Sequence, residues 1–109
     1  MSAAFPYAGP EPLRHAIGDA LQRVVDPELA LSIVDVGLVY GVTVSDDNVH
    51  VLLTMTSAAC PVTDLIIEDV ERELDHVVPA GRLIQVELTW QPAWSAERMS
   101  EDAKCFMGW

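Results

Sequence analysis

Cys60 is the residue whose type and position most favour chemistry in this sequence. It precedes Pro61 and follows the small residues Ser57, Ala58 and Ala59. Because proline is favoured in the first turn of a helix, we expect Cys60 at or beside a helix N-cap. The helix dipole and the free N–H groups there favour a thiolate, which is both a nucleophile and a metal ligand. The alternative is a cysteine that only packs, since lone cysteines are usually inert.

A second candidate is the turn Asp26-Pro27-Glu28, in which two carboxylates flank a proline. Carboxylate oxygens are ligands for hard cations, and they could also hold a protein partner. The alternative is a turn that ends a helix and carries two solvated acids, because the residue before a proline is disfavoured in a helix.

The other cysteine and the histidines add no recognisable motif. Cys105 lies beside Phe106 and Met107, which favours a buried or docking residue over a ligand. The histidines are scattered and lack the i, i+4 spacing of a zinc site; they are His15, His50 and His76. A Cys–His pair could still meet in the fold, but no third orienting group can be named, so the sequence does not favour an enzyme.

Composition limits the partners. There are 17 acidic residues against 6 basic ones, for a net charge of −11. Such a surface repels phosphate backbones and anionic lipids, so we expect neither nucleic acid nor a membrane as partner. Basic patches on partner proteins, or metal ions, are better suited to bind such an acidic surface. The N-terminal residues do not resemble a signal peptide, and no stretch approaches the roughly 20 apolar residues of a membrane helix. We therefore expect a cytoplasmic protein with reduced thiols.

The elements that position these residues follow from hydrophobic periodicity. In chain order we expect a helix from 11 to about 26, strands over 38–44 and 49–56, a helix over 61–76, a strand over 82–90, and a short last helix. The segment 33–36 is a short apolar run without a clear assignment. Ser95 or Ser100 could cap the last helix, and Gly108 would end it.

This order predicts an α/β (α+β) two-layer fold with a small mixed three-stranded sheet and helices mainly on one face. The first two strands form an antiparallel hairpin through the polar turn 45–48. The second and third strands flank a helix, so they should be parallel with a right-handed crossover. Residues 1–9 are expected to form a flexible arm, and residues 10–109 one domain.

Five short motifs, in order and with fitting gaps, resemble the SufT/PaaD-type family of iron–sulfur cluster assembly domains. They are Val25-Asp26-Pro27-Glu28, the run 33–40 (IVDVGLVY), Thr54-Met55-Thr56 with Cys60-Pro61, Gln91-Pro92-Ala93-Trp94, and Met99-Ser100. The resemblance covers roughly residues 16–108. The family usually has proline where this chain has Ala93.

The resemblance implies a maturation factor for iron–sulfur proteins, acting as carrier or adaptor, with assembly proteins and client apoproteins as partners. Cys60 would contact iron, a transient cluster or a client. The supporting pocket would be formed by Asp26, Glu28, Thr54 and Thr56. Trp94 would cover the site, lie at an interface, or pack in the core. One cysteine cannot hold a cluster that wants about four ligands, so a homodimer could contribute two. The alternative is an acidic interaction subunit without metal, for example of a phenylacetate-type oxygenase system.

Overall fold

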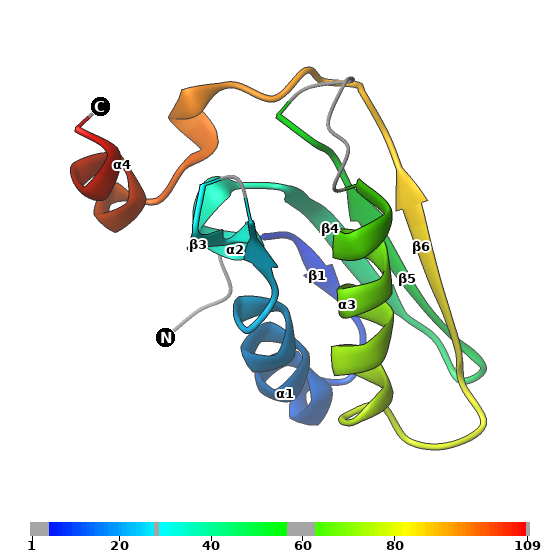
Figure 1. The fold of residues 1–109 in the computed structure, drawn as a ribbon. Helices are drawn as coiled ribbons and strands as arrows, with labels where there is room; N and C mark the ends of the chain where they lie inside the picture. Colours follow the sequence, from blue (N-terminus) through cyan, green and yellow to red (C-terminus); the bar gives the residue numbers. More distant parts are fainter. Residues whose placement is uncertain (1–4, 28, 57–62, 109) are drawn as a thin grey trace.

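The computed structural model describes residues 5–27, 29–56 and 63–108. Its main feature is a mixed sheet with the strand order β1-β4-β5-β6 (Figure 1). The strands are β1 (Tyr7–Ala8), β4 (Val39–Val44), β5 (Asn48–Leu53) and β6 (Leu83–Leu88). Helices α1 (Glu11–Gln22) and α3 (Thr63–Asp75) lie next to each other on one face of the sheet (Figure 1). The predicted two-layer arrangement with helices mainly on one face is thus confirmed.

The two large helices form where the sequence shows amphipathic periodicity. In α1 the buried face carries Ile17, Ala20 and Leu21. In α3 it carries Ile66, Val70 and Leu74. These side chains join one hydrophobic core with the sheet residues that point toward the helices, namely Val42, Val44, Val49, Val51 and Leu53.

An ion pair ties α1 to α3 at the surface. The Nε of Arg23 donates to Oε1 of Glu73 at 2.8 Å. This hydrogen bond to the charged form lowers the pKa of Glu73 below its ordinary value of 4.5. The pair therefore contributes to stability above that pH, and its contribution is lost as the pH falls through the lowered pKa.

Strand pairing follows the predicted topology. β4 and β5 are antiparallel, with an irregularity in register between Val39 and Gly41. β5 and β6 are parallel in continuous register and are connected through α3. The predicted hairpin and the predicted parallel crossover pair are both confirmed.

The sheet has four strands in the described residues, and the prediction of three was wrong. The extra strand is β1, which pairs in parallel with β4 through Tyr7 opposite Val42 and Ala8 opposite Thr43. A strand of two residues is too short to show the alternation of buried and exposed side chains in the sequence. Its pairing depends on the neighbouring strand. The division into an arm and a domain stays a prediction.

A small hairpin and a one-turn helix separate α1 from β4. Strand β2 (Val25–Asp26) pairs antiparallel with β3 (Leu31–Ser32). The first helix therefore ends at Gln22, earlier than predicted, because the next residues join this hairpin. The apolar run becomes α2 (Ile33–Val36), in which Oγ of Ser32 accepts from the N–H of Val34 at 3.2 Å. Gly37, with φ of 85°, ends it.

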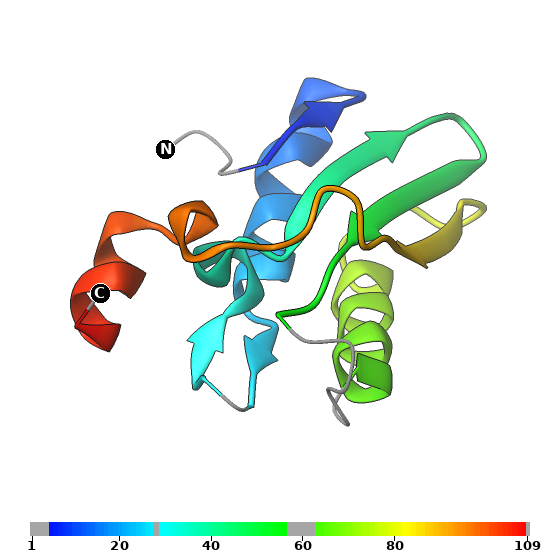
Figure 2. The same cartoon turned by 90° about the horizontal axis from the view of Figure 1, so that it is seen from above.

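The C-terminal segment runs from the end of β6 across the end of the sheet to α4 (Glu101–Met107) (Figure 2). A 3-10 turn, η1 (Ala96–Arg98), precedes α4. Oγ of Ser100 caps α4 by accepting from the N–H of Ala103 at 3.1 Å, and Gly108, with φ of 76°, ends it. Of the two predicted caps for α4, Ser100 is the right one, and the stop at Gly108 is confirmed.

Candidate functional site

The chain leaves β5 at the end of the sheet through Thr54, Met55 and Thr56, in the direction of the predicted cysteine. Thr54 is fully buried, and its N–H donates to the carbonyl of Leu38 at 2.9 Å. Met55 is also buried, whereas Thr56 is partly exposed. The segment is therefore anchored at the core a few residues before Cys60 in the sequence.

The hydroxyl of Thr54 is a buried polar group that has no hydrogen-bond partner among the described residues. Such groups are rare in native proteins because burial without a partner costs free energy.

Asp26 lies in β2 and is 1% exposed. Its carbonyl accepts from the N–H of Leu29 at 3.2 Å and from that of Ala30 at 2.7 Å. Ala30 has φ of 59°, so the turn after Asp26 is tight. The alternative prediction, a solvated acid, is wrong for Asp26, because this residue is removed from solvent. Burial of a carboxylate is costly unless polar contacts compensate it.

Cys60 and Glu28 lie outside the described residues, so their roles stay predictions. Of the predicted site, the structure describes Asp26, Thr54, Thr56 and Trp94. It places Asp26 in the small hairpin and the two threonines after β5.

Trp94 anchors the C-terminal segment to the body of the protein. Its Nε1 donates to the carbonyl of Val36 at 2.8 Å, and its ring packs against the core. Of the roles left open for Trp94, core packing is therefore confirmed. The hydroxyl of Tyr40 holds the same segment by donating to the carbonyl of Pro92 at 2.7 Å. Arg98 stacks over the Tyr40 ring, with Cζ at 4.3 Å from its centroid.

Sequence reasoning missed this anchoring, although Gly37 carried a signal for it. The N–H of Ser100 donates to the carbonyl of Asp35 at 2.8 Å, which brings the segment against α2. A glycine that follows directly on a short apolar run can mark close backbone approach as well as a turn. The partner segment, lying far along the chain, leaves no local pattern.

Within the described ranges, no three side chains of His, Cys, Asp or Glu are grouped so that they could hold a metal ion. His15 lies 3.4 Å from Asp19, and His50 lies 2.8 Å from Glu87, both on exposed surfaces. The described side chains alone therefore offer no complete metal site. None of the described helices is long and apolar enough to cross a membrane.

Comparison with known proteins identifies the class. The family described as iron-sulfur cluster assembly protein matches residues 14–88. The chain is 38% identical over 99 residues to the Fe-S protein maturation auxiliary factor YitW of Bacillus subtilis, covering 90% of this chain and 96% of YitW. It is 40% identical over 86 residues to the Fe-S protein maturation auxiliary factor SufT of Staphylococcus aureus, covering 78% of this chain and 97% of SufT.

A solved structure agrees with this match. The crystal structure of a domain of unknown function, DUF59, from Bacillus anthracis superposes with a TM-score of 0.83 at 41% identity, covering 90% of this chain and 93% of that one. The chain belongs to the iron–sulfur cluster assembly protein family, and the resemblance seen in the sequence motifs is confirmed.

The hydroxyl of Thr54, for which the described residues offer no hydrogen-bond partner, gives a stability prediction. Thr54→Val replaces the hydroxyl by a methyl group of similar size, so we expect the free energy of unfolding to rise by about 1 kcal/mol. Urea denaturation measures it. Thr43→Val makes the same change at an exposed position of β4 and should stay within about 0.5 kcal/mol of the wild type. A destabilised Thr54→Val protein would show that the hydroxyl has a partner.

Proposed function

We propose that this chain is an Fe–S protein maturation factor that serves client apoproteins through Cys60. The observation that carries the proposal is its likeness to two proteins named as Fe-S protein maturation auxiliary factors, of which it covers 96% and 97% of the length. The likeness extends over nearly the whole length of both relatives. It therefore supports the proposal that this chain has their whole role, and not only the role of one domain of a larger protein.

In this proposal the iron or cluster is cargo. The described residues offer no complete metal site, and a cluster wants about four ligands. Cys60 would hold the cargo together with thiolates from a second copy of the chain or from the client. Shared ligands suit a transfer step, because the client can replace one ligand at a time.

Asp26, Glu28, Thr54 and Thr56 would form the pocket around Cys60. Two features support this: Asp26 is a buried carboxylate, and the buried hydroxyl of Thr54 has no hydrogen-bond partner in the part of the chain that the structure describes. Both groups can hydrogen-bond to a bound species or to client backbone. An adaptor that contacts clients through Cys60 without holding iron would use the same pocket.

The test is maturation of an iron–sulfur enzyme in cells. Deleting the gene should lower aconitase activity per unit of aconitase protein, because apoenzyme accumulates, and restoring the gene should return it. Malate dehydrogenase, which has no cluster, is the matched control and should not change. Equal specific activity of aconitase with and without the gene, under both ordinary and iron-limited growth, would contradict the proposal.

A further inference from the structure

Strand β6 has an open edge. It is the last strand of the sheet and pairs with β5 on one side; in the part of the chain that the structure describes, no strand pairs with its other side (Figure 1). The N–H of Leu83 donates to the carbonyl of Asp47 at 2.9 Å, and that of Thr89 to the carbonyl of Leu53 at 2.8 Å. Backbone groups alternate in direction along a strand. The intervening residues of opposite parity therefore point their N–H and C=O groups outward; they are Ile84, Val86 and Leu88.

This edge lacks the usual protection. Natural edge strands are shortened, bulged, or carry proline or lysine. β6 has 6 residues, LIQVEL, and its register with β5 is continuous. Its one charged residue, Glu87, lies 2.8 Å from His50 across the sheet. The side chains of Ile84, Val86 and Leu88 pack against the core but stay partly exposed. An added strand would cover them and satisfy their backbone groups.

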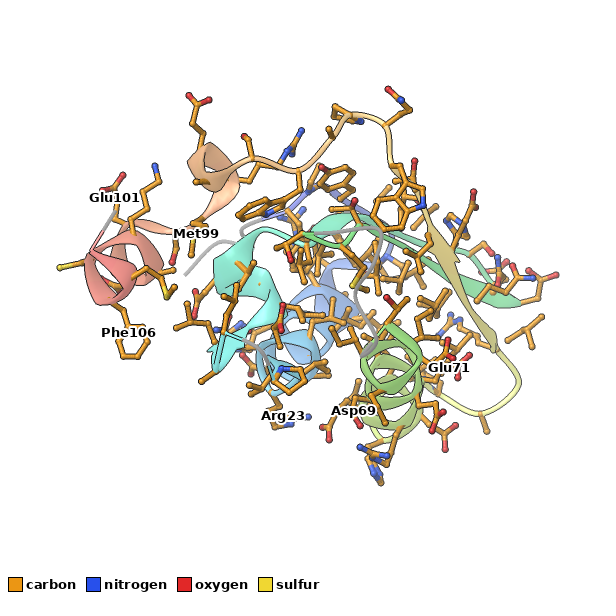
Figure 3. All side chains as sticks on the ribbon, turned by 45° about the horizontal axis from the view of Figure 1, so that its top comes forward. Arg23, Asp69, Glu71, Met99, Glu101 and Phe106 are labelled. Carbon is orange, nitrogen blue, oxygen red and sulfur yellow. The ribbon has the colours of Figure 1, made fainter. Side chains whose placement is uncertain are left out.

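A hollow of about 410 Å³ lies at the beginning of the same strand. It is lined by Glu71, Arg72, Asp75, Arg82, Leu83 and Ile84. Figure 3 shows the side chains of Glu71 and Asp69 projecting from α3, where Glu71 is exposed and Asp69 is partly exposed. Leu83 is 61% exposed, so the hollow combines apolar surface with charge.

The hollow is lined by two carboxylates and two guanidinium groups, and the carboxylates of Glu71 and Asp75 are not ion-paired to either arginine. Arg72 pairs with Asp69, and Nε of Arg82 donates to the carbonyl of Ser45 at 3.0 Å. No ion pair joins Glu71 or Asp75 to a described cation. These two acids are one helical turn apart, an arrangement in which like charges destabilise a helix. A cationic side chain with an aliphatic stem would relieve this repulsion and cover Leu83.

We propose that the β6 edge, meaning the outward backbone groups of Ile84, Val86 and Leu88, binds an extended basic segment of a partner protein as a fifth strand. A lysine or arginine of that segment enters the hollow between Glu71 and Asp75. The net charge of −11 opposes a second copy of the chain at this edge and favours a basic partner. The inference rests on the proposed function only for the partner's identity, an assembly protein or client.

The test is a selection of displayed random peptides of about twelve residues, enough to span the strand with flanks, against the full chain. Enriched peptides should carry lysine or arginine among β-branched residues. A synthetic copy of one should slow hydrogen exchange of the Ile84, Val86 and Leu88 amides. Enrichment of acidic or neutral peptides, no enrichment at all, or protection of other amides would overturn the inference.

Two variants separate the edge from the hollow. Val86→Pro removes an outward N–H, which an edge strand tolerates, and should weaken peptide binding about tenfold. Val86→Ala keeps the N–H and controls for the lost side chain. Glu71→Gln with Asp75→Asn should weaken binding about fivefold by removing the charges. Glu68→Gln with Glu97→Gln makes the same net change elsewhere on exposed positions and should have less than about a twofold effect.

Failure of the β6-edge inference and failure of the proposed maturation role give different experimental results. Cys60→Ser changes no residue of β6 or of the hollow, and the Cys60→Ser protein should bind the selected peptide with unchanged affinity. Intact peptide binding with unchanged aconitase maturation in the deleted strain would overturn the maturation role alone. Normal maturation by the Val86→Pro and Glu71→Gln/Asp75→Asn proteins, with the peptide no longer bound, would show that this edge does not serve maturation and would overturn the partner's identity as an assembly protein or client.

Discussion

Cys60→Ser is expected to abolish maturation of client proteins while leaving the fold intact. A serine hydroxyl stays protonated near neutral pH and is a poor ligand for iron, whereas a thiolate is a strong one. The two side chains are nearly the same size, and urea denaturation of the Cys60→Ser protein checks that it folds. The measurement is aconitase activity per unit protein in a strain whose only copy of the gene carries the substitution.

Anaerobic reconstitution with iron and sulfide distinguishes a carrier from an adaptor. A carrier gains visible absorbance in the wild type and loses it in Cys60→Ser. An adaptor shows no chromophore in either protein but still loses maturation on substitution. Cys105→Ser is the matched control, because Cys105 is an exposed thiol on α4. Full maturation by the Cys60→Ser protein would contradict any role of this thiol.

Much of the fold could be predicted because its larger elements have their own periodicity. The helices α1 and α3 and the strand β5 each bury one regularly spaced set of side chains, and the sequence displays that spacing. Strand β1 and helix α2 are too short to show a period. Their structure depends on neighbours that are distant in the chain, so only the folded protein reveals them.

The candidate site was predictable in part for a related reason. The predicted order of strand and helix placed Thr54 and Thr56 at the end of β5. This placement could be predicted because it depends only on the local alternation of side chains in the strand. The burial of Asp26 could not be foreseen, since aspartate in a Pro-containing turn is usually solvated. The docking of Trp94 on Val36 joins residues far apart in sequence, and nothing local encodes it.

Gly37→Ala is expected to lower the free energy of unfolding by about 3 kcal/mol, from left-handed strain and lost hydrogen bonds together. Gly37 has φ of 85°, where any residue with a Cβ is strained. A Cβ there would lie 2.4 Å from the carbonyl oxygen of Arg98. The C-terminal segment would have to move away from α2, weakening the bonds that Trp94 and Ser100 make to it.

Gly81→Ala is the matched control that separates the two causes. Gly81 has φ of 95°, but a Cβ there would meet nothing within 4 Å. It should therefore cost only the backbone strain, about 1 kcal/mol. Urea denaturation of both variants gives the comparison, and tryptophan fluorescence of native Gly37→Ala should report a changed environment for Trp94. Equal destabilisation of the two variants would show that the segment yields freely at Arg98. A clear excess at Gly37 would mean that this glycine is required because the C-terminal segment packs against the body of the protein there.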